Sequence, residues 1–89
     1  MTAREVVVGH KLGLHARVSA RLVHLSQQYQ SRILISRPGD ADAGADARSI
    51  LSILLLAASC GTRVRVAAEG EDEREAVDAL CRYLENEPS

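Results

Sequence analysis

The sequence predicts an α+β fold, with helices on one face of a largely antiparallel sheet. Short β-branched runs alternate with longer segments in which apolar residues recur every three or four positions. The length of 89 residues is enough for one small domain and too short for two, because the fraction of surface that a chain buries falls as the chain becomes shorter. We therefore expect a single domain over residues 1–89, in the order βαββαβα.

The first half of the chain holds the pattern strand, helix, strand and weak strand. Residues 5–8 form the front of a β-branched run that Gly9 ends, and residues 10–14 follow as a loop with Gly13 as its pivot. A helix starts at Ala16, with one apolar and one polar face. Its apolar face contains Val18, Leu22, Leu25 and Tyr29, and its polar face contains Ser19, Arg21 and Gln28. A strand at residues 33–37 stops at Pro38-Gly39, and a weak strand is expected within residues 43–47.

The second half begins with an unusually apolar segment at residues 50–58. Ser49 is suited to cap a helix there, and Gly61 to stop it. Periodicity alone also permits a buried strand, but the abundance of Leu and Ala favours a helix. A short surface helix buries one side only, so we expect Ile or Leu side chains to face solvent or a partner.

The chain ends with a strand and a helix. Residues 63–67 alternate strictly between polar and apolar, and Gly70 turns the chain. Residues 71–73 place acidic side chains in the first turn of the last helix, where the helix dipole favours them. The apolar stripe of this helix contains Ala76, Val77, Leu80, Tyr83 and Leu84.

Composition narrows the possible partners. Hydrophobic residues make up 46% and aromatic residues only 2%, so the core is built from aliphatic side chains and no aromatic platform for bases exists. The net charge of −1 offers no basic footprint for nucleic acid or acidic lipid. The apolar run at residues 53–58 is far below the roughly 18 residues of a membrane span. We expect a soluble cytoplasmic protein whose Cys60 and Cys81 are reduced thiols, with a disulfide as the less favoured alternative.

His15 is the candidate reactive residue. A neutral imidazole nitrogen is a nucleophile near pH 7, and the phosphoramidate it forms passes the phosphoryl group on. Such a site needs an exposed ring, a helix N-terminus and a balancing cation, which the loop at Gly13, the helix start at Ala16 and Arg17 supply. From spacing alone, a loop histidine with no special chemistry remains the favoured alternative.

Other chemistries find little support. His10 is interpreted as a loop residue that could approach His15, and His24 as a partly exposed helix residue. These histidines and the two cysteines lack metal-ligand spacing, so we expect no metal and no cofactor. The chain also has no phosphate-binding Gly-rich loop and no paired carboxylates in a plausible cleft, which disfavours a self-contained enzyme.

Several motifs resemble the HPr family, the histidine-containing phosphocarriers of the bacterial sugar phosphotransferase system. They are GLHAR at 13–17, Arg48-Ser49-Ile50, GTRVRVAAEGEDE at 61–73, and the opening strand and last helix around them. The resemblance spans nearly the whole chain. It implies an open-faced β-sandwich, in which three helices cover one face of a four-stranded sheet.

The resemblance also implies a relay. Enzyme I, charged from phosphoenolpyruvate, would phosphorylate Nδ1 of His15, and the chain, as a monomer, would pass the group to an enzyme IIA domain. Arg17 matches an arginine that assists transfer, and the amides of Ala16, Arg17 and Val18 would hold the phosphoryl group. Ser49 matches a serine that an ATP-dependent kinase, HPr kinase/phosphorylase, modifies in many Gram-positive bacteria; a helix cap alone remains an equal alternative.

The first two helices of the family form its docking face. We assign to that face Leu14, Ala20, Ile50, Leu51, Ile53 and Leu54. The same exposed apolar surface then serves more than one transient partner.

Two departures from the family pattern keep a second reading open. Val18 stands where the family usually has proline, which restores one amide donor near the phosphate. The acidic loop at residues 37–48 is longer than usual. A divergent HPr-like module, acting by contact or in a nitrogen-related or dihydroxyacetone-kinase relay, is the alternative.

Overall fold

The computed structural model describes residues 1–39 and 44–86. Its elements are β1 (Thr2–Val7), α1 (Ala16–Ser26), β2 (Arg32–Ser36), β3 (Ala45–Asp46), α2 (Ile50–Leu56), β4 (Arg63–Glu69) and α3 (Glu73–Glu85). This order confirms the predicted βαββαβα arrangement. The apolar segment after Ser49 is a helix, which decides against the buried strand.

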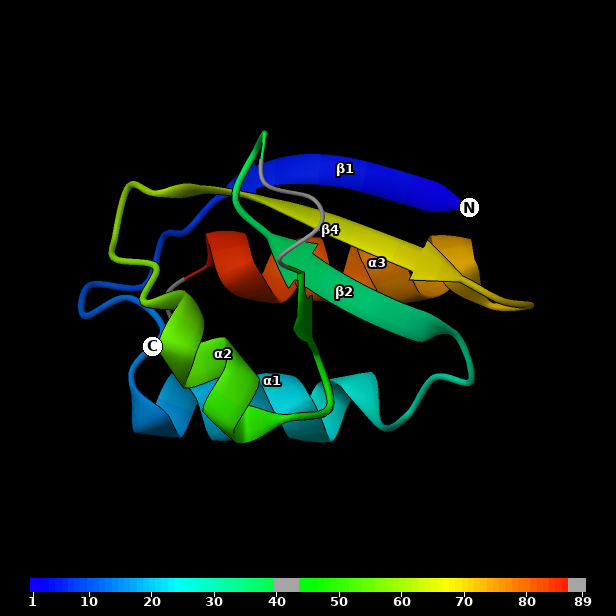
Figure 1. Cartoon of the computed structure of the whole chain (residues 1–89), viewed down its shortest axis with the longest axis horizontal. Helices are drawn as coiled ribbons and strands as arrows, with labels where there is room; N and C mark the ends of the chain where they lie inside the picture. The colour runs from blue at the N-terminus through cyan, green and yellow to red at the C-terminus, as the bar shows by residue number, and fades with distance from the viewer. Residues whose placement is uncertain (40–43, 87–89) are drawn as a thin grey trace.

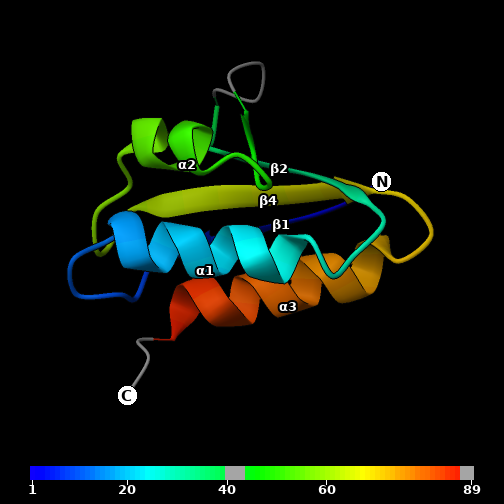
Figure 2. The same cartoon turned by 90° about the horizontal axis from the view of Figure 1, so that it is seen from below.

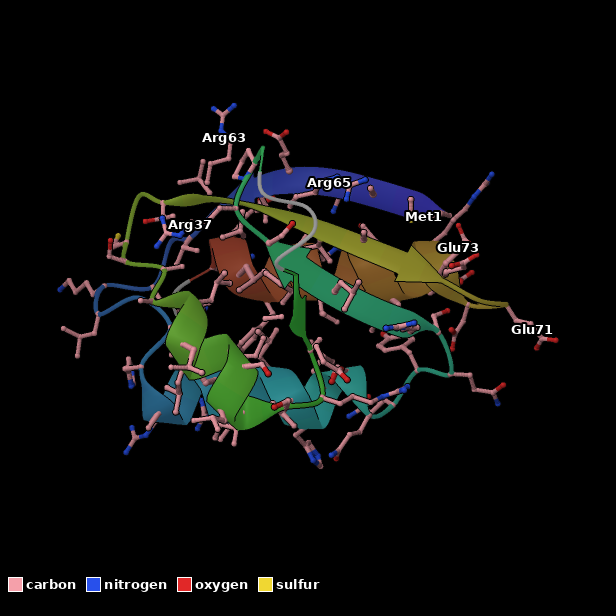
Figure 3. The ribbon with its side chains drawn as sticks, in the orientation of Figure 1. Met1, Arg37, Arg63, Arg65, Glu71 and Glu73 are labelled. Atoms are coloured by element: carbon pink, nitrogen blue, oxygen red, sulfur yellow. The ribbon has the colours of Figure 1, made fainter. Side chains whose placement is uncertain are left out.

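The four strands form one antiparallel sheet in the order β1-β4-β2-β3 (Figure 1). β1 begins at Thr2, earlier than predicted, because Thr2 pairs with Ala68 across the β1–β4 ladder. The N-terminal amine also lies 3.2 Å from the Glu73 carboxylate, and Figure 3 shows Met1 and Glu73 at this end of the sheet. These contacts hold the first residues of the chain in the sheet.

The helices are arranged around α1. Figure 2 shows α1 and α3 side by side below the sheet, with α2 on the other side of α1. α3 contacts β1 and β4, whereas α2 contacts α1 and β3. The core between these layers is aliphatic, as expected. Its large, fully buried side chains include Leu22, Ile35, Ile53, Leu80, Leu84, Val64 and Val66.

The end of α2 differs from the prediction. The helix stops at Ala57, whose φ of 53° lies in the left-handed region, and not at Gly61. The Arg37 guanidinium donates hydrogen bonds to the carbonyls of Leu56 and Ala57, at 3.1 and 3.2 Å. A side chain from another part of the chain thus takes over carbonyls that a helix end leaves unsatisfied.

Other boundaries also differ from the prediction. β4 continues to Glu69, and α3 begins at Glu73, so Glu71 and Asp72 precede its first turn. α1 ends at Ser26, so Tyr29 packs on the core from the following turn, and β2 ends at Ser36, one residue before the predicted end. The weak third strand is confirmed at Ala45–Asp46. Gly44 and Ala47, within its predicted range, lie outside the strand. Residue 43 and the middle of the long acidic loop fall on residues 40–43, outside the described residues.

Asp72 has a different role from the one its position suggests. It precedes α3 but makes no side-chain cap hydrogen bond. Its carboxylate accepts hydrogen bonds from the Ser31 hydroxyl and from the amides of Gln30 and Ser31. The hydroxyl bond and the amide bonds lower the pKa of Asp72. The carboxylate therefore ties the turn between α1 and β2 to the start of α3.

Neither cysteine is bonded to the other: Cys60 is exposed and Cys81 is buried. Among the described residues, no helix has the length and apolar character needed to cross a membrane.

Candidate functional site

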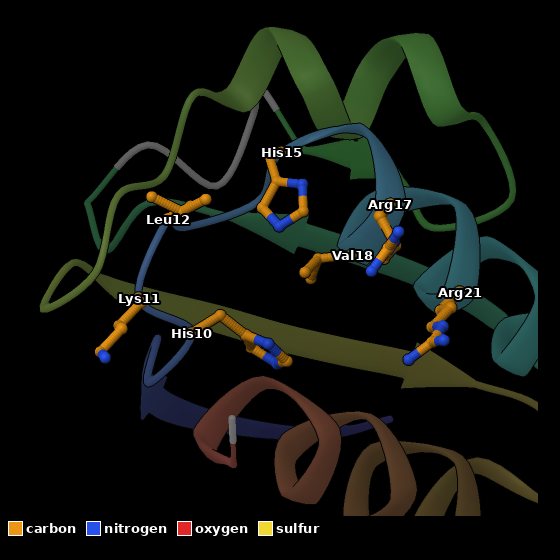
Figure 4. A pocket seen from close by; sticks show the side chains of 7 residues that line it. All are labelled: His10, Lys11, Leu12, His15, Arg17, Val18 and Arg21. Carbon is orange, nitrogen blue, oxygen red and sulfur yellow. The ribbon is translucent and has the colours of Figure 1, made fainter. Parts of the chain in front are cut away.

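His15 occupies the residue immediately before α1. Its backbone is extended, with φ −73° and ψ 178°, and its side chain makes no capping hydrogen bond to the helix. The backbone carbonyl of His15 instead accepts the amide of Ser19 at 2.8 Å, the first bond of the helical ladder. The half-buried imidazole is therefore not used for capping and lines an open pocket (Figure 4).

The first turn of α1 offers backbone donors next to this ring. The amides of Ala16, Arg17 and Val18 precede the first helical hydrogen bond, so the helix itself provides no acceptor for them. They lie at the positive end of the helix dipole, and no acidic side chain lies in the first turn. The start of α1 is suited to hold an anion beside His15.

Cations surround the same pocket, which has a volume of about 380 Å³. Its lining residues are His10, Lys11, Leu12, His15, Arg17, Val18 and Arg21. No carboxylate belongs to this lining within the described parts of the chain. In Figure 4 the side chains of Arg17 and Arg21 extend from successive turns of α1 toward the pocket. The arrangement favours a phosphoryl group, which needs positive charge and several donors.

The loop that carries His15 is held by contacts with the end of α2. The Leu14 amide donates to the Ala58 carbonyl at 2.9 Å, and the Ser19 hydroxyl donates to the Leu14 carbonyl at 2.9 Å. Ser19, predicted on the polar face of the helix, is fully buried, whereas Arg21 and Gln28 are exposed. The spacing of Ser19 from His15 contained a usable signal, because a serine in a first turn commonly bonds nearby backbone groups.

His10 comes to the pocket as the sequence suggested, but it is not an ordinary loop residue. Its side chain is 2% exposed and contacts α3. His24 is exposed on α1. Within residues 1–39 and 44–86, no three His, Cys, Asp or Glu side chains gather closely enough to hold a metal ion.

The predicted docking residues divide into two groups. Ala20, Ile50, Leu51 and Leu54 are exposed, with Leu51 at 64%. Leu14 and Ile53 are instead buried in the core, so their assignment to the surface is corrected: they pack beneath it. Two exposed leucines were missed, Leu12 in the His15 loop and Leu55 on α2. Leu55 follows Leu51 by four positions, which places both on one helical face.

Ser49 caps α2. Its side chain accepts the Ser52 amide at 3.3 Å, and its backbone is extended as in an N-cap residue. The cap predicted from the sequence is confirmed, while nothing in this contact tests phosphorylation.

Ser49→Ala should lower the free energy of unfolding by about 1 kcal/mol, because one amide of the short α2 loses its acceptor. Urea denaturation of the two proteins measures the change. Ser52→Ala is the matched control, since the Ser52 contribution to this cap is a backbone amide that the substitution retains. Equal losses in both variants would contradict a capping role for the Ser49 hydroxyl.

Together, the four-stranded open sheet and the uncapped His15 at a helix N-terminus define a small α+β protein with a histidine-centred pocket that is suited to an anion. A family model described as "PTS HPr component phosphorylation site" matches residues 2–86. The chain belongs to the HPr family of phosphocarriers of the phosphotransferase system, as its motifs indicated.

Known members resemble it over nearly their whole length. The phosphocarrier protein HPr of Xylella fastidiosa (strain 9a5c) is 44% identical, with 97% of this chain and 93% of the relative covered. A crystal structure of HPr from Thermoanaerobacter tengcongensis has a TM-score of 0.86 at 34% identity, covering 96% and 92% of the two chains. A crystal structure of Crh from Bacillus subtilis, a domain-swapped dimer, has a TM-score of 0.72 at 36% identity, covering 94% and 93%.

Proposed function

We propose that this chain carries a phosphoryl group on His15, taking it from enzyme I, which is charged by phosphoenolpyruvate, and giving it to an enzyme IIA domain. The observation that carries the proposal is the placement of an uncapped His15 ring at the N-terminus of α1, in a pocket lined by Arg17 and Arg21. Family membership supplies the class of reaction.

In the proposed reaction, Nδ1 of His15 attacks the phosphorus held by enzyme I. The nitrogen–phosphorus bond forms as the bond to the donor breaks. In the second transfer, a nucleophile of enzyme IIA attacks the same phosphorus, and the nitrogen–phosphorus bond breaks, which leaves the His15 ring free again. The amides of Ala16, Arg17 and Val18 and the Arg17 guanidinium receive the phosphoryl oxygens. These amides and the guanidinium supply the positive charge and the hydrogen-bond donors that the phosphoryl oxygens need. The proposed transfer therefore requires no metal or cofactor.

Partner binding is proposed to use the apolar surface of α2. Leu51 and Leu55 are exposed, and exposed apolar patches on small proteins commonly mark interaction sites. We propose that the chain acts as a cytoplasmic monomer, so that one surface serves enzyme I and enzyme IIA in turn. Sedimentation at working concentration tests the monomer.

A kinase that modifies Ser49 would recognise the start of the same helix.

The test is incubation with enzyme I and phosphoenolpyruvate, followed by intact mass at neutral or alkaline pH. We expect one added phosphate that is lost in acid and absent in His15→Ala. His24→Ala, which removes an exposed histidine of the same helix, is the matched control and should be labelled like the wild type. Phosphate that persists in His15→Ala, or no phosphate with several enzymes I, would refute the proposal.

A second candidate is a regulatory module that acts by contact or in a different relay. The similarity to Crh and the valine in place of the usual proline favour it. Transfer from phosphorylated chain to enzyme IIA separates the candidates. Rapid transfer supports the carrier, whereas a chain that is labelled but gives nothing to any enzyme IIA supports the alternative.

A further inference from the structure

His10 is buried in the His15 pocket although nothing in the carrier reaction requires a second histidine. Its side chain is 2% exposed, and Nε2 lies 2.6 Å from the backbone carbonyl oxygen of Tyr83 in α3. A carbonyl oxygen only accepts, so Nε2 carries the hydrogen and donates it. Nδ1 is buried and has no hydrogen-bond partner among the described residues.

Such an environment is not explained by packing alone. Burying a polar atom without a partner disfavours the folded state, and an aliphatic side chain of similar size would avoid that loss. What His10 adds is the donor bond to Tyr83, together with ring contact between the two side chains at a centroid distance of 5.0 Å. The bond joins residues 73 positions apart in the sequence.

Tyr83 contacts the other side of the site as well. Its hydroxyl donates to the Val18 carbonyl at 3.1 Å. Burial raises the pKa of Tyr83, so the phenol stays protonated and remains a donor. Val18 lies in the first turn of α1, whose amides have no acceptor within the helix and are close to His15. One residue of α3 therefore holds both the segment before His15, through His10, and the helix start after it.

The loop itself connects these contacts to His15. The Gly13 amide donates to the His10 carbonyl at 2.9 Å, which closes a turn two residues before His15. The Gly9 amide donates to the Leu84 carbonyl at 2.8 Å, so the start of the loop is also held on α3. In Figure 4 the His10 ring lies between the His15 loop and α3. Movement of His10 would move the base of the loop that presents His15.

We propose that His10 and Tyr83 form a brace that positions the His15 ring against the first-turn amides of α1 for phosphoryl transfer. Both are positioning residues, because neither needs to touch the phosphoryl group. The inference rests on the proposed carrier function and adds to it two residues outside the GLHAR motif. Positioning matters since small displacements of reacting groups lower rates strongly.

Replacement of His10 tests the brace. His10→Leu removes the donor and keeps the bulk, whereas His10→Gln keeps an amide donor near the position of Nε2. We expect His10→Leu to lower kcat for phosphate acceptance from enzyme I roughly 10- to 100-fold, with KM within about twofold of wild type. His10→Gln should restore most of the loss. His24→Leu, on an exposed site of α1, should leave kcat unchanged.

Equal kcat losses in His10→Leu and His10→Gln, or a wild-type kcat in folded His10→Leu, would overturn the brace. If His10→Leu does not fold, Tyr83→Phe decides, because it removes only the hydroxyl bound to Val18: a lowered kcat supports the brace and an unchanged kcat refutes it.

Amide hydrogen exchange separates this proposal from the carrier function. In the unphosphorylated protein, His10→Leu, or Tyr83→Phe in its place, should speed exchange at Gly13 and Ser19 at least about tenfold while β4 stays unchanged. Unchanged exchange overturns the brace even if the chain is a carrier. Faster exchange supports the brace even if the wild-type chain takes no phosphate, in which case the carrier function alone fails.

Discussion

Gly13→Ala should lower the free energy of unfolding by at least about 2 kcal/mol and slow phosphoryl transfer at the same time. Gly13 has a φ of +67°, a conformation that costs an alanine energy. A Cβ at this position would also lie 2.5 Å from the Ala58 carbonyl oxygen and 2.7 Å from the Ser59 Cα. Both are backbone atoms, so the loop and the end of α2 must separate.

The separation would reach the His15 pocket, because the Ala58 carbonyl accepts the amide of Leu14, the residue next to His15. Urea denaturation and the enzyme I assay measure the two effects. Gly61→Ala is the matched control: Gly61 has a φ of +89°, but a Cβ there meets nothing within 4 Å. It should lose only about 1–2 kcal/mol of backbone strain and keep its transfer rate. Indistinguishable variants would show that close packing at Gly13 is unimportant.

Arg17→Ala should slow phosphoryl transfer about 100-fold while changing the free energy of unfolding by less than about 0.5 kcal/mol. The Arg17 side chain is exposed and makes no hydrogen bond or ion pair within the described residues, so folding loses little without it. In the proposed reaction, transfer loses a charged donor beside the position where the phosphoryl group would be held. Single-turnover transfer from enzyme I and urea denaturation of the same samples provide the two numbers.

Two variants sharpen this experiment. Arg17→Lys should recover only part of the rate, because an ammonium group lacks the planar fork that binds two phosphoryl oxygens together. Arg21→Ala removes a cation that lines the same pocket one turn further from His15, and should slow transfer less than Arg17→Ala. A sharp loss of stability in Arg17→Ala with an unchanged rate would make Arg17 structural and the assignment wrong.

The sequence patterns predicted those structural features that depend on interactions within a single helix or strand. Apolar spacing placed α1 and α3, alternation placed β4, and Ser49 marked the start of α2. These features depend on side-chain direction within one element, which follows from the period of that element. A boundary that depends on a distant partner was predicted less well. The end of α2 at Ala57 is an example, because Arg37 donates hydrogen bonds to the carbonyls of Leu56 and Ala57.

The candidate site divides in the same way. His15 and Arg17 were assigned through the resemblance of the contiguous GLHAR motif to the HPr family, since the spacing of a loop histidine before a helix is not specific enough by itself. Ser19 was misplaced, since its hydroxyl is used by a carbonyl of the preceding loop and not by solvent. Ile53 was assigned to the surface because an apolar helix does not reveal which of its sides meets the core, and Leu14, in the loop before α1, is buried in the same core.

The sequence by itself therefore determined the order of elements, because each element is encoded within a few neighbouring residues. It also nominated His15 and Arg17, through the resemblance of residues 13–17 to the HPr family, and their reactivity stays a prediction. Only the tertiary structure decided the strand order β1-β4-β2-β3, the exposed side of α2 and the contact of His10 with Tyr83. The physical reason is sequence separation. Contacts between distant segments depend on how whole layers pack, and the spacing within one segment carries no record of its partner.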